Sequence, residues 1–242
     1  MRNRPWRGHA PVGLRAVTTA RALELVAFDI AGTTVQEGGR VYVALEEAAR
    51  ALGADPTAEQ IESWMGADKR AAISGLLTAS GIEADSQVVE AGFADFRARL
   101  DAAYGEHPPT PMPGVLDLFD ALHARGTKVA LTTGFDRPVV DTVLAAVGWD
   151  DTILDAVVCV DDVAQGRPAP DMIERAMEMT GVTDATAVAA VGDTVRDIGA
   201  GRAAQVGLVV GVRSGETDGQ TLFDAGADVV IDSVAELLGV LP

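Results

Sequence analysis

The chain has 242 residues, enough to bury the core of one domain that carries an insertion, or the cores of two domains. Its formal net charge of −17 argues against nucleic acid as a partner, because phosphate backbones attract basic surfaces, and no apolar run approaches the length that spans a bilayer. The single cysteine, Cys159, excludes an intrachain disulfide framework and favours a reducing cytoplasm.

The first 22 residues differ in charge from the rest of the chain. They contain five arginines and no acidic residue, and they lack the apolar region of a signal peptide. We therefore predict a disordered basic leader over residues 1–22 and leave it out of the fold.

The first predicted strand runs from Glu24 to Phe28 and is followed by Asp29. A turn of small residues and threonines comes next, from Ala31 to Thr34. Open α/β sheets bind ligands at the carboxyl ends of their strands, so Asp29 could be a nucleophile, a metal ligand or both. It could equally cap an ordinary turn, and this stretch alone does not decide between these readings.

Residues 38–107 have a helical pattern and no strand pattern. Apolar residues recur at helical spacing, and caps and breakers divide the segment into four predicted helices: Arg40 to Gly53, Pro56 to Trp64, Asp68 to Ser80, and Asp85 to Tyr104. A proline-rich linker from His107 to Gly114 follows. We predict a helical insertion over residues 38–107.

From residue 108 to the end of the chain, helices and strands alternate. Strands are predicted at 129–132, 156–160, 187–191, 206–210 and 229–231, and helices at 115–125, 138–147, 170–180, 195–204 and from 234 onwards. This alternation predicts an α/β fold with a parallel sheet covered on both faces. Residues 23–37 and 108–242 would form this core together.

Polar residues follow each of the first four predicted strands of this core. They are Asp29, then Thr133 and Gly134, then Arg167, and finally Asp193 and Asp197. The carboxyl ends of parallel strands share one edge of the sheet, so these side chains should converge.

The converging groups suit phosphoryl transfer. Asp29 and Asp193 offer oxygen ligands for Mg²⁺, and Asp197, one helical turn further on, could orient metal-bound water. Thr133 and the backbone N–H groups after Asp29 could bind phosphoryl oxygens, while Arg167 could neutralise charge. Each residue alone could instead be a strand-end hydroxyl, a surface arginine, a helix cap or a first-turn acid. That none of these residues has a functional role, although they occur in this order at strand ends, is the weaker interpretation.

The order Asp29…Thr133…Arg167…Asp193-x-x-x-Asp197 resembles the four motifs of the haloacid dehalogenase superfamily. The resemblance covers about residues 23–240. It implies a Rossmann-like parallel-sheet core with a small α-helical cap domain inserted after the first strand. It also implies Mg²⁺ held by Asp29, Ala31 and Asp193, and an aspartyl-phosphate formed on Asp29.

Within that superfamily, the stretch from Asp29 to Thr34 is similar to the phosphonatase branch. Most phosphatases of the superfamily have a second Asp, the acid and base for the leaving alcohol, where this chain has Ala31. Met65-Gly66-Ala67-Asp68-Lys69 resembles the cap motif whose Lys forms a Schiff base with the substrate aldehyde. The resemblance implies catalytic roles for Asp29, Lys69, Thr133 and Arg167, and supporting roles for Gly32, Thr33, Met65, Gly134 and Asp197.

The chemistry of lysine supports this reading independently. Only two of the 19 basic residues are lysines, Lys69 and Lys128. Cleaving a C–P bond leaves a carbanion, which an iminium on Lys69 could stabilise and an arginine could not. The alternative for Lys69 is a solvated helix residue near a cap. Lys128 stands just before a predicted strand, and we interpret it as a surface residue.

Three departures separate the chain from phosphonoacetaldehyde hydrolase, the type member of that branch. Ala72, Phe135 and the region of Gly39 stand where that enzyme has a His, a Tyr and a Cys. The leading hypothesis is C–P cleavage of a phosphonoacetaldehyde-like substrate. The alternatives are hydrolysis of a small phosphomonoester and a catalytically idle binding module on the same fold. A haloacid dehalogenase proper is disfavoured by the acidic cluster at Asp193 and Asp197. Relatives of the branch pair through the cap, which makes a homodimer an expectation.

Overall fold

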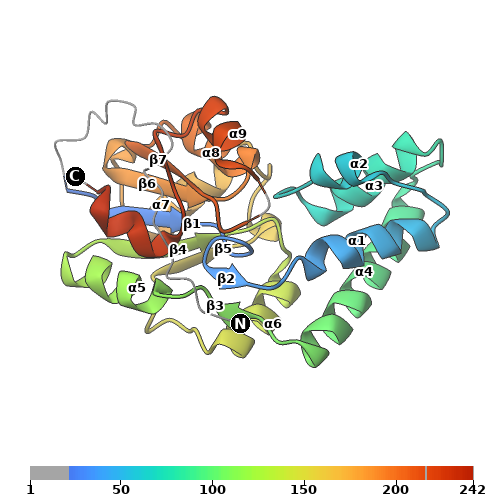
Figure 1. Cartoon of the computed structure of the whole chain (residues 1–242), viewed down its shortest axis with the longest axis horizontal. Helices are drawn as coiled ribbons and strands as arrows, with labels where there is room; N and C mark the ends of the chain where they lie inside the picture. Colours follow the sequence, from blue (N-terminus) through green and yellow to red (C-terminus); the bar gives the residue numbers. More distant parts are fainter. Residues whose placement is uncertain (1–21, 216, 242) are drawn as a thin grey trace, which may run out of the picture.

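The structure is a computed structural model that describes residues 22–215 and 217–241, so nearly all of the predicted leader lies outside it. The core is a six-stranded parallel sheet in the order β5-β4-β1-β6-β7-β8 (Figure 1). The strands span Leu25–Phe28 (β1), Lys128–Thr132 (β4), Ala156–Val158 (β5), Val188–Gly192 (β6), Leu208–Val212 (β7) and Val229–Ile231 (β8). The predicted α/β class is confirmed.

Strand β1 lies at the centre of the sheet, between β4 and β6. Phe28 pairs with Leu131 on one side and with Val191 on the other, so Asp29 emerges level with the ends of both neighbours. The chain winds outward from β1 in both directions, which makes this point the switch in strand order. Rossmann-like sheets bind their ligands at this position.

Alternate residues of the strands face opposite sides of the sheet, and each side is covered by helices. Val26 and Phe28 pack with α5 (Val115–Ala124) and α6 (Arg137–Val147), whereas Leu25 and Ala27 pack in a second cluster with helices of the other face. That face carries α7 (Asp171–Thr180), α8 (Val195–Ala203) and α9 (Gly219–Asp224). Burial on both faces explains why the strands are nearly continuous apolar runs.

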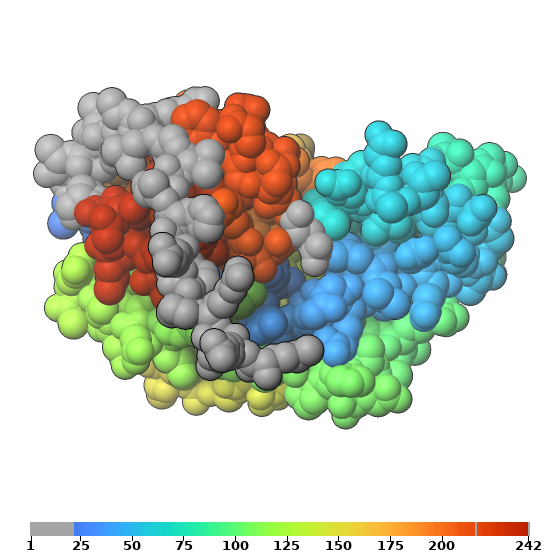
Figure 2. All heavy atoms as spheres, viewed as in Figure 1, coloured from blue at the N-terminus to red at the C-terminus, as the bar shows by residue number. Residues whose placement is uncertain are grey.

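The segment after β2 (Val35–Gln36) is helical, as predicted. Its helices are α1 (Arg40–Ala51), α2 (Ala58–Glu62), α3 (Lys69–Ala79) and α4 (Ser86–Glu106). Leu45, Ile73 and Phe96 are fully buried and join the larger apolar core. Figures 1 and 2 show this cap as a lobe beside the core, coloured blue to green. The domain limits at residues 38 and 107 stay a prediction.

The two passages between core and cap form structure that the sequence did not predict. Strand β2 (Val35–Gln36) pairs antiparallel with β3 (Thr110–Pro111), which lies inside the predicted proline-rich linker. Two-residue strands are too short to produce a periodicity of two, so only tertiary pairing reveals them. The pairing holds the entry to the cap and the exit from it side by side.

Several predicted elements differ at their ends. The helix expected from Val234 is a 3₁₀ helix, η3 (Val234–Gly239), and the short α9 was not predicted. The 3₁₀ turns η1 (Val160–Asp162) and η2 (Ala185–Ala187) shorten the strands predicted at 156–160 and 187–191. The strand predicted at 206–210 lies two residues further on, as β7. No helix in the described ranges combines the length and the apolar character that crossing a membrane requires.

Candidate active site

Asp29 extends from the end of β1 into a tight turn and is almost fully buried. The Thr34 hydroxyl donates a hydrogen bond to the backbone carbonyl of Asp29 over 2.9 Å, which fixes the turn. Gly32 has a φ of +84°, and a Cβ there would lie 2.7 Å from a carboxylate oxygen of Asp193. Only glycine therefore lets this turn approach Asp193 without strain.

Asp193 follows β6 and is the second buried carboxylate of the site. The Thr33 hydroxyl donates a 3.0 Å hydrogen bond to its Oδ1. Burial raises the pKa of Asp193, and the neighbouring charge of Asp29 raises it further. The two carboxylates repel each other, and a cation placed between them would relieve that repulsion.

Arg167 enters from the loop after β5 and connects two carboxylates. Its Nη1 donates to Asp29 Oδ1 over 2.7 Å, and the same nitrogen is ion-paired with Asp197. The other oxygen of Asp197 accepts hydrogen bonds from the hydroxyl and backbone N–H of Thr194, at 2.6 and 3.0 Å. In this arrangement Asp197 holds Arg167 in place. The sequence had predicted that Asp197 orients metal-bound water, and it did not predict this ion pair.

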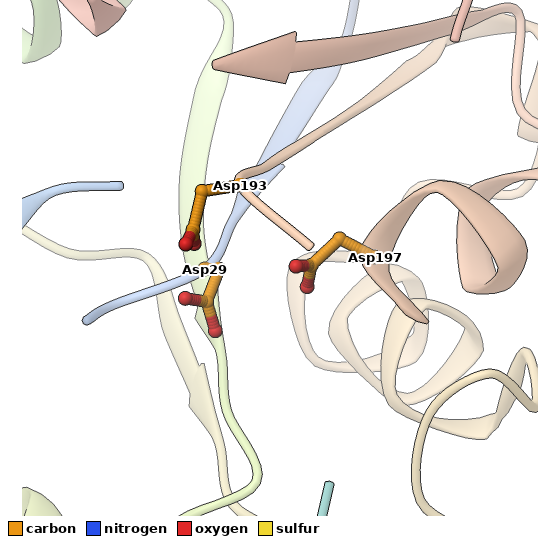
Figure 3. Close-up of side chains that lie close together, drawn as sticks. All are labelled: Asp29, Asp193 and Asp197. Carbon is orange, nitrogen blue, oxygen red and sulfur yellow. The ribbon is translucent and has the colours of Figure 1, made fainter. Parts of the chain in front are cut away.

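The three aspartates form a cluster suited to a metal ion. Asp29, Asp193 and Asp197 each offer a carboxylate oxygen, and these oxygens lie within 4.8 Å of one another (Figure 3). Oxygen-rich clusters of this kind suit Mg²⁺. Arg167 and Thr194 engage both oxygens of Asp197, whereas Arg167 contacts only Oδ1 of Asp29, so Asp29 and Asp193 are the better candidates as ligands. Ala31, whose only oxygen belongs to the backbone, lies in the same turn.

Lys69 is the first residue of α3, and its side chain is only 3% exposed. The Asp68 carboxylate caps the helix by accepting from the Ala71 N–H at 2.8 Å. The Lys69 Nζ donates to the carbonyl of Ala67 over 2.8 Å and lies 5.9 and 5.7 Å from the ring centroids of Tyr42 and Phe135. Burial, and then the charge of Arg167, lower the pKa of Lys69 to about 8.

One cavity collects residues that are far apart in the sequence. Asp29, Lys69, Thr133, Gly134 and Arg167, all named by the sequence, line it together. A Cβ on Gly134 would lie 2.7 Å from the Ala67 carbonyl oxygen, so this glycine lets the cap loop approach the core.

Met65 does not line that cavity. It lies on a neighbouring groove between cap and core, with Glu59, Thr194 and Thr217. Met65, for which we predicted a supporting role, therefore does not contact the cavity of Asp29 and Lys69 directly.

This geometry agrees with the comparison to known proteins. The model of the haloacid dehalogenase-like hydrolase family matches residues 23–205. The chain belongs to this family.

Individual members show the same likeness in more detail. A phosphonoacetaldehyde hydrolase from Paraburkholderia xenovorans is 29% identical, over 90% of this chain and 94% of that enzyme. A phosphonoacetaldehyde hydrolase-like protein from Oleispira antarctica has a similar fold, with a TM-score of 0.78 at 25% identity over 96% of this chain and 94% of that one. A hydrolase from Pseudomonas syringae matches with a TM-score of 0.80 at 23% identity, over 90% and 97% of the two chains. Among haloacid dehalogenase-like hydrolases, the chain is phosphonatase-like.

Two features of this hydrolase could not be found by motif alone. Tyr42, on α1, lines the cavity beside Lys69, but its sequence position suggested only a helix residue. Arg196, on α8, donates to the Ser63 carbonyl over 3.1 Å and lies 5.6 Å from the ring centroid of Trp64, which ties the core to the cap. The only feature of the sequence that could have drawn attention to Tyr42 is that the chain has just two tyrosines.

Proposed function

We propose that this hydrolase cleaves the C–P bond of phosphonoacetaldehyde or of a closely related small phosphonate. The observation that carries the proposal is Lys69, an amine of lowered pKa buried in the same cavity as Asp29. An amine of this kind is partly neutral near neutral pH and can attack an aldehyde. A simple phosphomonoesterase has no need of it.

The first part of the proposed reaction activates the substrate. The Lys69 nitrogen forms a bond to the aldehyde carbon, and the carbonyl oxygen leaves as water as the C=N bond forms. The resulting iminium is protonated, and its carbon is bonded directly to the carbon that bears phosphorus. It can therefore accept the electron pair of the C–P bond, which gives an enamine instead of a free carbanion.

The second part transfers the phosphoryl group. The Asp29 carboxylate attacks phosphorus and forms an aspartyl-phosphate, while the C–P electron pair moves into the enamine. Arg167, 2.7 Å from Asp29 Oδ1, orients that carboxylate and neutralises charge on the phosphoryl group. Thr133 and the backbone N–H groups after Asp29 would bind the phosphoryl oxygens. Protonation of the enamine carbon and hydrolysis of the imine release acetaldehyde, and water hydrolyses the aspartyl-phosphate.

A magnesium ion fits the acidic part of this site. Asp29 and Asp193, with the backbone of Ala31, would hold it, and it would neutralise the negative charge that gathers around phosphorus. Burial first, and then the neighbouring charge of Asp29, raise the pKa of Asp193, and a cation held between the two carboxylates would relieve their repulsion.

Ala31 is the second support for the proposal. It lines the cavity at the position where most phosphatases of the superfamily carry an acid for the leaving alcohol. An alkoxide would then leave without a proton donor, whereas an enamine needs none at that moment. The alternative function is hydrolysis of a small phosphomonoester, and the following experiment distinguishes it from C–P cleavage.

The test is reductive trapping of the imine. The protein is incubated with Mg²⁺, phosphonoacetaldehyde and borohydride, and modified lysines are located by mass spectrometry. We expect an adduct on Lys69 and none on Lys128, a half-exposed lysine that pairs with Asp155 at 3.3 Å. The Lys69→Arg variant should give no adduct. Turnover of phosphate monoesters without an adduct on Lys69 would refute the proposal, and no phosphate release from any phosphonate or phosphate ester would favour an idle binding module.

We also propose a cytoplasmic homodimer that forms through the cap. Val43, on α1, is 56% exposed and offers apolar surface for such a contact. Size-exclusion chromatography with light scattering would give twice the monomer mass. A Val43→Glu variant should shift it to the monomer, and a monomeric wild type would refute the dimer.

A further inference from the structure

Tyr42 lies where two cavities of the site meet. It lines the cavity of Asp29 and Lys69, and also an adjoining cavity of about 190 Å³ that Glu37, Asp193 and Ser214 border. The Lys69 Nζ is 5.9 Å from the centroid of its ring. A substrate carbon bonded to that nitrogen would therefore lie close to the phenol.

The Tyr42 hydroxyl has the character of a donor. Burial raises its pKa, and the charges of Asp193 and Asp29 raise it further, so the phenol keeps its proton at neutral pH. The backbone of Gly66 lies beside the phenolic oxygen and only partly offsets this rise in pKa. The phenol therefore keeps a proton that it can donate to another oxygen.

The other side-chain hydroxyls that line this cavity have different tasks. The Thr194 hydroxyl donates to Asp197 over 2.6 Å. The Thr133 hydroxyl, which accepts from the Phe135 N–H over 3.2 Å just after β4, is the proposed donor to the phosphoryl oxygens. Phe135 carries no hydroxyl. Among the residues that line the cavity, Tyr42 is therefore the hydroxyl next to Lys69 that can serve a substrate oxygen.

We propose that Tyr42 is a catalytic residue whose hydroxyl donates a hydrogen bond to the substrate carbonyl oxygen while Lys69 attacks the carbonyl carbon. This inference rests on the proposed C–P cleavage. As the N–C bond forms, the C=O electron pair moves onto oxygen, which takes up the proton that nitrogen releases. The oxygen then takes up a second proton from solvent and departs as water when the C=N bond forms, which leaves the iminium with its positive charge. The Tyr42 hydroxyl stabilises the charge that grows on this oxygen and is not consumed.

The Tyr42→Phe variant removes one oxygen and keeps the ring. Tyr104→Phe is its matched control, because Tyr104 is the chain's other tyrosine, is buried in the apolar core, and its hydroxyl finds no hydrogen-bond partner among the described residues. Three quantities are measured with Mg²⁺ on the full chain: kcat and KM for phosphonoacetaldehyde, the rate of borohydride-trapped adduct on Lys69, and turnover of acetyl phosphate. Acetyl phosphate needs Asp29 but no imine.

We expect Tyr42→Phe to lower both kcat for phosphonoacetaldehyde and the trapping rate by about 10- to 100-fold, as for loss of one donor to a developing oxyanion. Its ratio of phosphonoacetaldehyde to acetyl phosphate turnover should fall at least about 10-fold, while Tyr104→Phe matches the wild type. Unchanged trapping, or an equal loss with both substrates, would overturn the role of Tyr42. A wild type that cleaves acetyl phosphate but gives no adduct would instead overturn the C–P proposal itself, and the role of Tyr42 with it.

Discussion

Replacing Lys69 by methionine should stabilise the fold while it abolishes C–P cleavage. Methionine is similar in length and can occupy the same space near the Tyr42 and Phe135 rings, but it carries no amine. Wild-type protein must hold a lysine that is only 3% exposed, and the variant has no ammonium group to desolvate.

The size of the effect follows from the lowered pKa. A shift from 10.5 to about 8 corresponds to about 3 kcal/mol of unfavourable free energy for keeping the amine charged in the folded state. The variant also loses the 2.8 Å hydrogen bond to the Ala67 carbonyl, at a cost of about 1 to 2 kcal/mol. We therefore expect a net gain in the free energy of unfolding of about 1 to 2 kcal/mol at pH 7.

The pH dependence gives the sharper test. Below pH 8 the amine is protonated in both the folded and unfolded states, and the full penalty is present. Between about pH 8 and 10.5 the unfolded state still binds the proton but the folded state does not, so wild-type stability rises relative to the variant. The advantage of Lys69→Met should therefore shrink through this window.

The assay is urea unfolding of both proteins at pH 7 and pH 9.5, without metal, with stabilities compared at equal m-values. Lys128→Met is the control, because that lysine is half exposed and should show little change at either pH. A Lys69→Met variant less stable than the wild type at pH 7, or a stability difference that does not change with pH, would refute the reasoning about a buried, weakly basic amine.

Three further predictions concern the reaction. Asp29→Asn should lower turnover of every substrate at least about 1,000-fold with a thermal midpoint within a few degrees of wild type; wild-type-like activity would exclude Asp29 as nucleophile. Between pH 6 and 9, kcat/KM for phosphonoacetaldehyde should rise through a midpoint near pH 8 and level off toward pH 9 as Lys69 loses its proton, and a profile that falls over this range would contradict it. Arg196→Ala should lower kcat/KM about 5- to 30-fold, because it removes the hydrogen bond to Ser63 and the contact with Trp64. The control is Arg175→Ala, which removes only a surface ion pair with Glu178. Equal kcat/KM values for the two variants would exclude a role of this contact between core and cap.

The sequence by itself determined the fold class and most of the cavity. Buried strands are apolar runs, cap helices repeat their apolar residues at helical spacing, and both patterns are local, so they can be read without a structure. The rule that parallel strands share one carboxyl edge was enough to predict that Asp29, Thr133 and Arg167 converge, which the structure shows.

Only the tertiary structure decided how these residues are partnered. Asp197 anchors Arg167, Met65 lies outside the cavity, and Tyr42 lies within it, because each depends on where the cap meets the core. The pairing of β2 with β3 and the contact of Arg196 with Ser63 join segments 74 and 133 positions apart. Such contacts leave no periodic pattern in either segment, because their free energy comes from a partner that is distant in the chain.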